Sequence, residues 1–169
     1  MKRVDPRPAA DERTTIDQFL DYQRATLLGK TEGLDADGLN RRLLPSTLTL
    51  GGLLKHLALV EDSWIQEKFL GRAEVEPWAS APWAEDRDWD FHSAEDDDPD
   101  ALRELYRSAC ERSRQALVGA ELSALSVGTD RDGAHWNLRW ILTHLIEETA
   151  RHCGHADLLR EAIDGTVGE

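Results

Sequence analysis

Apolar residues recur at helical spacing in four long segments of the chain, which we expect to form four amphipathic helices. These segments span residues 15–33, 47–70, 99–118 and 138–164, with the second helix starting at Thr47 or Thr49. Asn137 suits the N-cap of the last helix, Gly165 suits its end, and Pro99 suits the first turn of the third helix. We find no alternation typical of a β-strand. The pattern therefore predicts an all-α protein that folds as a four-helix bundle.

The connections between these helices differ greatly in length. Residues 34–48 need only turn the chain, with a short turn of helix at residues 36–41. Residues 71–98 form a long crossover connection that carries Trp78, Trp83 and Trp89. A connection this long usually has a function or is disordered, and three tryptophans offer apolar area that would hold it against other groups. We expect the crossover to lie across the bundle.

The length of 169 residues suits a single domain. We expect this domain to span residues 1–169. Residues 1–12 hold two prolines and show no hydrophobic period, so we interpret them as a loose N-terminal arm.

Charge and composition exclude several classes of partner. Acidic residues outnumber basic ones by 33 to 20, which gives a formal net charge of −13. Binding to nucleic acid or to an anionic membrane needs clustered lysine and arginine, so we expect neither partner. The N-terminal residues lack the apolar core of a signal peptide and no apolar run has the length of a membrane span, which predicts a cytoplasmic protein. Cys110 and Cys153 form no CxxC motif, so we expect no disulfide framework and no cysteine-rich zinc site.

Several ionisable residues fall on helix faces that we expect to be buried. At about 100° per residue, His144, Glu148, His152 and His155 lie within the apolar arc of the last helix, and His56 lies within that of the second helix. Burying an unpaired charge or imidazole costs several kcal/mol. Each of these side chains therefore needs a partner.

Ordinary partners explain single members of this group. A lone inward histidine such as His56 is usually a hydrogen-bonded core residue, and Glu148 could pair with Arg139 or Arg151 at the edge of its helix face. Cys153 points away from this arc, and we interpret it as a buried structural thiol.

A shared metal ion explains the group as a whole. Side chains four residues apart lie on one helix face, so Glu148 and His152 can converge on one ion, with His56 as the third ligand from the second helix. Two imidazoles and a carboxylate suit Zn²⁺ first and Ni²⁺ as a neighbouring alternative, and three protein ligands leave a position open for water or a substrate. We therefore predict His56, Glu148 and His152 as metal ligands. Residues that could support these ligands or replace one of them are His144, His155 and Arg151.

Motifs of the commonest cofactor and nucleophile sites are absent, namely GxGxxG, GxxxxGK[ST], GxSxG and HExxH. The residues that remain resemble the DinB-like superfamily. The resemblance covers nearly the whole chain and rests on two stretches: the glycine-rich start of the second helix, Gly51-Gly52-Leu53-Leu54-Lys55-His56, and the run Glu148-Thr149-Ala150-Arg151-His152-Cys153-Gly154-His155 in the last helix.

Members of this superfamily are four-helix bundles with three metal-binding histidines, one on the second helix and an HxxxH pair on the last. The resemblance implies that His56 and His152 are the first and third ligands and that Glu148 takes the place of the middle histidine. His155 stands where many members have glutamine.

The combination of histidine, glutamate and histidine is similar to a mycothiol-dependent branch of this superfamily, the maleylpyruvate isomerases. This resemblance implies a zinc ion and mycothiol as cosubstrate, with the metal lowering the pKa of the thiol so that a thiolate meets an electrophilic small molecule. The sequence, up to Glu169, has no counterpart of the C-terminal domain of those isomerases. The resemblance thus implies either thiol S-transfer or isomerisation, and we expect a homodimer.

Two other functions fit the same residues. One is a metal-binding bundle without turnover that acts in stress response, and the other is a metal-dependent hydrolase in which bound water is the nucleophile. If the protein is an enzyme, we expect Trp78, Trp83 and Trp89 of the crossover to wall a pocket for the electrophile near the metal.

Overall fold

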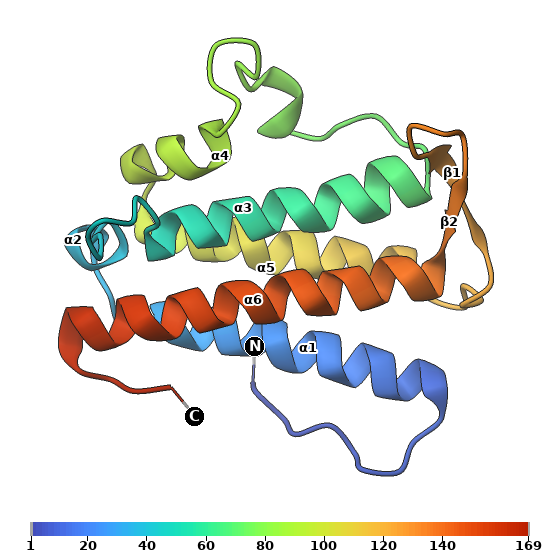
Figure 1. Cartoon of the computed structure of the whole chain (residues 1–169), viewed down its shortest axis with the longest axis horizontal. Helices are drawn as coiled ribbons and strands as arrows, with labels where there is room; N and C mark the ends of the chain where they lie inside the picture. Colours follow the sequence, from blue (N-terminus) through green and yellow to red (C-terminus); the bar gives the residue numbers. More distant parts are fainter. Residues whose placement is uncertain (1, 169) are drawn as a thin grey trace.

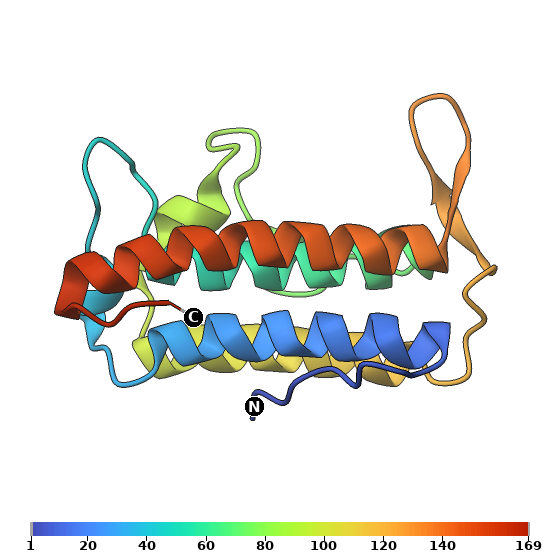
Figure 2. The same ribbon diagram turned by 60° about the horizontal axis from the view of Figure 1, so that its bottom comes forward.

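A computed structural model describes residues 2–168 of the chain. The long helices are α1 (Glu12–Thr31), α3 (Leu50–Asp62), α5 (Pro99–Ala116) and α6 (Leu138–Asp164). Figures 1 and 2 show them as a bundle with α3 and α6 in one layer and α1 and α5 in the other. The predicted four-helix bundle with a long crossover is confirmed.

Most helix ends follow the signals in the sequence. The Trp140 N–H donates to the Asn137 side chain at the start of α6, and Gly165 ends this helix in the left-handed region at φ 78°. Pro99 is the first residue of α5. The predicted start of α1 was three residues late, because Asp11 is the residue whose carboxylate accepts the Thr14 N–H and caps the helix.

The predicted second helix is formed by two consecutive segments. The α-helix α3 continues directly into the π-helical segment η1 (Ser63–Phe69), and Gly71 follows at φ 66°. A side chain on Gly71 would lie 2.6 Å from Val127, so both the backbone angle and the close contact favour glycine at this position.

The crossover folds back along the bundle and packs on it, as predicted. Helices α3 and α5 run in the same direction, so the connection must return the chain to the end of the bundle where α3 begins (Figure 1). It contains three short helices, η2 (Trp78–Ser80), α4 (Trp89–His92) and η3 (Ser93–Asp96). Trp78 is fully buried, and its indole N–H donates to Asp62 at 2.9 Å. The connection between α1 and α3 contains one short helical turn, α2 (Ala36–Leu39).

A small β-hairpin contradicts our expectation of no β-strand. Strands β1 (Leu125–Thr129) and β2 (His135–Asn137) pair in antiparallel fashion just before α6. Leu125 and Val127 are exposed while Ser126 is buried, which reverses the usual placement of apolar residues in a half-buried strand. The hydrophobic pattern therefore gave no signal for these strands.

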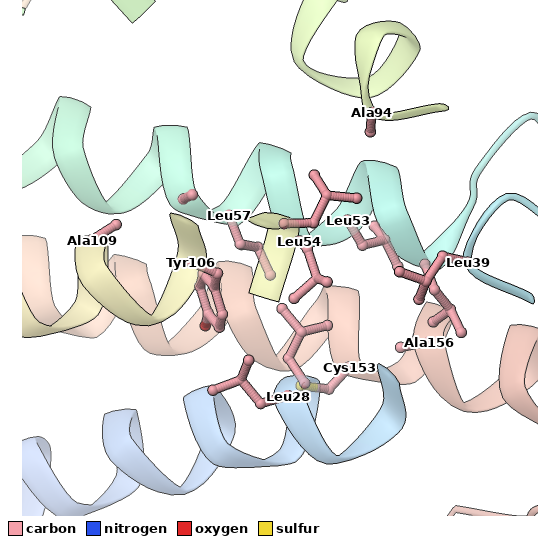
Figure 3. Packing of buried hydrophobic residues seen from close by; sticks show 14 of the residues in the cluster. Leu28, Leu39, Leu53, Leu54, Leu57, Ala94, Tyr106, Ala109, Cys153 and Ala156 are labelled. Carbon is pink, nitrogen blue, oxygen red and sulfur yellow. The ribbon is translucent and has the colours of Figure 1, made fainter. Parts of the chain in front are cut away.

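Two apolar clusters fill the bundle. The larger one joins α3, α5 and α6 with the end of α1, and it includes Ala94 of η3, so the crossover is attached to the core (Figure 3). The smaller cluster lies toward the hairpin and includes Leu20, Ile65 and Leu142. Helix α6 packs mainly against α1, and α3 packs mainly against α5.

One ion pair lies inside the bundle. The guanidinium of Arg24 donates two hydrogen bonds to Glu61, from Nε and Nη2, each at 2.6 Å. Their side chains are 4% and 2% exposed. Arg24 also contacts the half-exposed Asp21 at 3.0 Å. This pairing satisfies two charges that water does not reach.

Residues 2–10 contain no helix or strand. The Arg7 N–H donates to Gln18 and the Arg3 guanidinium lies 5.2 Å from the ring centre of Tyr22, so this segment follows α1. The division into one domain and an N-terminal arm stays a prediction. None of the described helices combines the length and the apolar character needed to cross a bilayer.

Candidate metal centre

The three predicted ligands come together between α3 and α6. His56, Glu148 and His152 each offer a ligand atom, and these atoms lie within 4.8 Å of one another. Glu148 Oε1 lies 3.2 Å from His152 Nε2 and 3.5 Å from His56 Nε2. The side chains are 10–19% exposed, so solvent still reaches the group.

His56 has an outer partner that the sequence analysis did not find. Its Nδ1 lies 2.7 Å from Asp90 Oδ2, and Asp90 is only 4% exposed. With the Nδ1–H donating to this carboxylate, the Nε2 lone pair is directed toward Glu148. Histidine ligands of metals usually have such a carboxylate behind them. The one sequence feature that pointed to Asp90 is its position between two aromatic residues, Trp89 and Phe91, in a crossover that has to pass back over α3.

Phe91 and Gly52 hold the crossover close to His56. The Phe91 ring stacks on the His56 ring at 4.4 Å between centres. Gly52 lies one turn before His56, and a side chain there would lie 3.2 Å from the Phe91 carbonyl oxygen. Glycine at this position therefore allows α4 to approach α3 where Asp90 must reach His56.

The predicted supporting residues divide into two groups. His155 lies beside the site, with its Nδ1 3.3 Å from His152 Nδ1. His144 instead packs on Trp64 and Trp140, and its Nδ1 lies 3.7 Å from the carboxylate of Glu147.

The arginines near this face bind other carboxylates. Arg151 pairs with Glu147 and is largely exposed, and Arg139 pairs with Glu12. The two arginines at the edge of this helix face therefore pair with carboxylates other than Glu148, and the ordinary explanation that we considered for its position does not apply.

The electrostatics of the group favour the protonation states that metal binding requires. Burial raises the pKa of the Glu148 carboxyl, but the neighbouring His152 and His56 outweigh burial and leave the pKa below its usual value. Burial lowers the pKa of His152, the charge of His56 lowers it further, and Glu148 only partly offsets both. An ionised carboxylate and a neutral imidazole are the forms that bind metals.

The donor set also fits a divalent ion in size. Zinc lies about 2.0–2.2 Å from nitrogen and oxygen ligands, so two ligands of a tetrahedral site are about 3.3 Å apart. The distances of 3.2 and 3.5 Å from Glu148 to the two histidines are close to that value. Because the Nδ1 atoms of both histidines face outer partners, their Nε2 atoms are free for a metal.

These features define a class of protein. A four-helix bundle with a long crossover, and with two histidines and a carboxylate facing one another between α3 and α6, has the architecture of a DinB-like metal-binding bundle. A comparison with protein families gives the particular family: the model for mycothiol S-transferase matches residues 15–165, and the chain belongs to this family. Membership makes the protein a thiol transferase and confirms the predicted superfamily and activity. No curated protein matches the chain.

We expect Asp90→Asn to weaken metal binding by about tenfold to a hundredfold, because the loss of an outer carboxylate releases the orientation of a histidine ligand. Titration of the metal-free protein with Zn²⁺ against a competing chelator measures this. Asp86→Asn is the matched control, since Asp86 pairs with the exposed His92 in the same way at 2.8 Å. Equal zinc affinity of both variants would show that Asp90 does not support His56.

The protein's own thiols should not react in conjugation assays. Burial raises the pKa of both Cys110 and Cys153 to about 12, so almost no thiolate is present at neutral pH. We expect neither residue to be alkylated by iodoacetamide at pH 8 in the native protein and both to be alkylated in urea. Mass spectrometry of the treated protein gives the number of alkylated cysteines.

Proposed function

We propose that the protein is a divalent-metal-dependent mycothiol S-transferase whose metal is held by His56, Glu148 and His152. The observation that supports this most directly is the convergence of the three ligand atoms within 4.8 Å. When bound, the ion supplies Lewis acidity, which lowers the pKa of a coordinated thiol. Zinc is the expected ion because two imidazoles and a carboxylate with an open position are typical of catalytic zinc sites, and nickel is the alternative.

The chain's own residues prepare this site for chemistry. Asp90 fixes the tautomer of His56, and Phe91 covers one face of the His56 ring. Glu148 contributes the negative charge of the ligand set. In the transfer to a haloarene, a sulfur–carbon bond forms, the halide departs with the bonding electron pair, and the thiol proton passes to solvent. With an epoxide or an enone, the sulfur–carbon bond forms as the ring opens or the double bond is saturated, and the resulting alkoxide or enolate takes up the proton.

Family membership favours this function over the alternatives. A bundle without turnover or a hydrolase would fit the three ligands equally well, but the matched family is one of mycothiol transferases. Mycothiol as the cosubstrate of this chain, a homodimer and a cytoplasmic location are predictions that accompany the proposal.

The proposal is tested by metal analysis followed by conjugation assays. The purified protein should contain close to one zinc or nickel ion per chain, and the metal-loaded form should join mycothiol to at least one electrophile in a panel of haloarenes, epoxides and enones. Removal of the metal should abolish the reaction and its return should restore it. A metal-loaded protein that conjugates none of them, or a metal-free protein with full activity, would refute the proposal.

A further inference from the structure

Four aromatic side chains form a cluster beside the metal centre. They come from three elements, Trp64 from η1, Trp136 from β2, and Trp140 and His144 from α6. The ring of Trp64 lies at the centre of the group, 5.2 Å from Trp136, 5.4 Å from Trp140 and 4.7 Å from His144. We call these four residues the aromatic cluster.

The aromatic cluster is partly open to solvent. Trp140 is 46% exposed and the His144 side chain is 26% exposed. Trp136 also borders a shallow, open depression with residues 129–132 at the turn of the hairpin. Trp140 therefore presents a flat apolar face to solvent, with the rings of Trp64, Trp136 and His144 behind it.

The cluster is continuous with the metal centre. His144 precedes Glu148 by four residues, which places it one turn away on the same face of α6, about 6 Å along the axis. Trp64 follows His56 by eight residues, about 12 Å along the other helix. Since α3 and α6 run in opposite directions, both steps lead from the metal centre toward the hairpin (Figure 1).

The central ring is held in place before any ligand binds. Trp64 meets Trp136 and His144 edge to face, and the Lys68 ammonium lies 5.1 Å from its ring centre while donating to Ser63. These contacts restrict the rotation of Trp64. Trp140 stacks on His144 at an interplanar angle of 21°. Its ring forms the solvent-exposed side of the aromatic cluster.

We propose that the aromatic cluster binds the electrophilic substrate and that this substrate carries a planar aromatic or conjugated ring. The proposal rests on the transferase function, because it places the reacting carbon at the metal centre and the ring on the exposed face of Trp140. Trp140 precedes Glu148 by eight residues, about 12 Å along α6, so the ring of such a substrate is joined to its reacting carbon by a spacer. Flat π-systems stack favourably on such faces. Mycothiol, which is rich in hydroxyl groups, would instead need hydrogen-bond partners. The hydroxyl of Ser63, beside Trp64, already accepts a hydrogen bond from Lys68.

Two substitutions at Trp140 test the proposal in the assay. The electrophile is an iodoacetamide joined through a short linker to a naphthalene ring. The sulfur–carbon bond forms, iodide leaves with the bonding electrons, and the thiol proton passes to water. We expect Trp140→Ala to raise the KM for this electrophile by on the order of tenfold, with little change for the aliphatic iodoacetamide or in the KM for mycothiol. Trp140→Phe should restore most of the affinity. Leu158→Ala is the matched control, because Leu158 is a 58% exposed apolar residue elsewhere on α6.

A binding measurement separates this inference from the transferase function. We expect the metal-free protein to enhance the emission of anilinonaphthalene sulfonate, and Trp140→Ala to weaken this binding by a similar factor while Leu158→Ala does not. Unchanged probe binding in Trp140→Ala overturns the inference, whatever the activity. A changed KM for mycothiol in place of the electrophile assigns the cluster to the cosubstrate and also overturns it. A wild-type dimer that Trp140→Ala converts to a monomer makes the cluster a subunit interface, with the same consequence. Absence of conjugation with intact probe binding counts against the transferase function instead.

Discussion

Glu148→Gln should lower the affinity of the protein for zinc by at least about a hundredfold, more than the loss of an outer-shell partner. The amide keeps the size of the side chain but removes the negative charge of the ligand set, and it leaves His56 and His152 as two neutral donors. Metal content of the purified variant and a competitive chelator titration measure the loss. Conjugation activity should fall with the metal content.

Two neighbouring substitutions act as controls for this experiment. Glu147→Gln makes the same chemical change one residue earlier, where the side chain is half exposed and pairs with Arg151. His144→Gln removes an imidazole that lies one turn away on the same helix face. Both variants should retain the metal. If Glu148→Gln retained as much zinc as these two, the carboxylate would not be a ligand.

Glu61→Gln should lower the free energy of unfolding by about 3 kcal/mol or more, because it leaves the charge of Arg24 buried with only the half-exposed Asp21 as a charged partner. A change of that size lowers the ratio of folded to unfolded protein more than about a hundredfold. Urea denaturation of the metal-free wild type and variant measures the difference in their free energies of unfolding. The comparison holds when both proteins show the same dependence of that free energy on urea concentration.

An exposed pair provides the comparison for this stability prediction. Glu104→Gln breaks the contact between Arg107 and Glu104, whose side chains are 46% and 62% exposed, and should cost less than about 1 kcal/mol. Replacing both Arg24 and Glu61 by leucine should recover most of the stability, since neither position then holds a buried charge. A Glu61→Gln protein as stable as Glu104→Gln would mean that water reaches Arg24.

Much of the bundle was predictable from the sequence because it depends on local periodicity. The helix of residues 138–164 is marked at both ends by Asn137 and Gly165, and the placement of Glu148 and His152 on one face follows from a spacing of four residues. The pairing with His56 across two helices followed from the same reasoning, because all three residues lie where apolar side chains would be expected.

Long-range partners were not predictable in this way. Asp90 reaches His56 across 34 positions, and its place between Trp89 and Phe91 does not indicate which residue of another helix it contacts. His144 shares its helix face with Glu148, so periodicity alone could not separate a residue that packs on Trp64 from a residue at the metal centre. The contacts of Asp90 and of His144 both depend on which segment of another helix or strand packs against them.

The packing of the four helices would give a metal bound at this site a second role. Because α6 packs mainly on α1 and α3 mainly on α5, ligands drawn from α3 and α6 would join two helix pairs that the apolar contacts connect less extensively. Binding energy at such a position is shared with folding, and an ion at a hundred times its dissociation constant stabilises the native state by about 2.7 kcal/mol. The melting temperature of the protein should therefore report how much of it carries metal, and cells short of that metal would hold a population that is both inactive and more readily degraded.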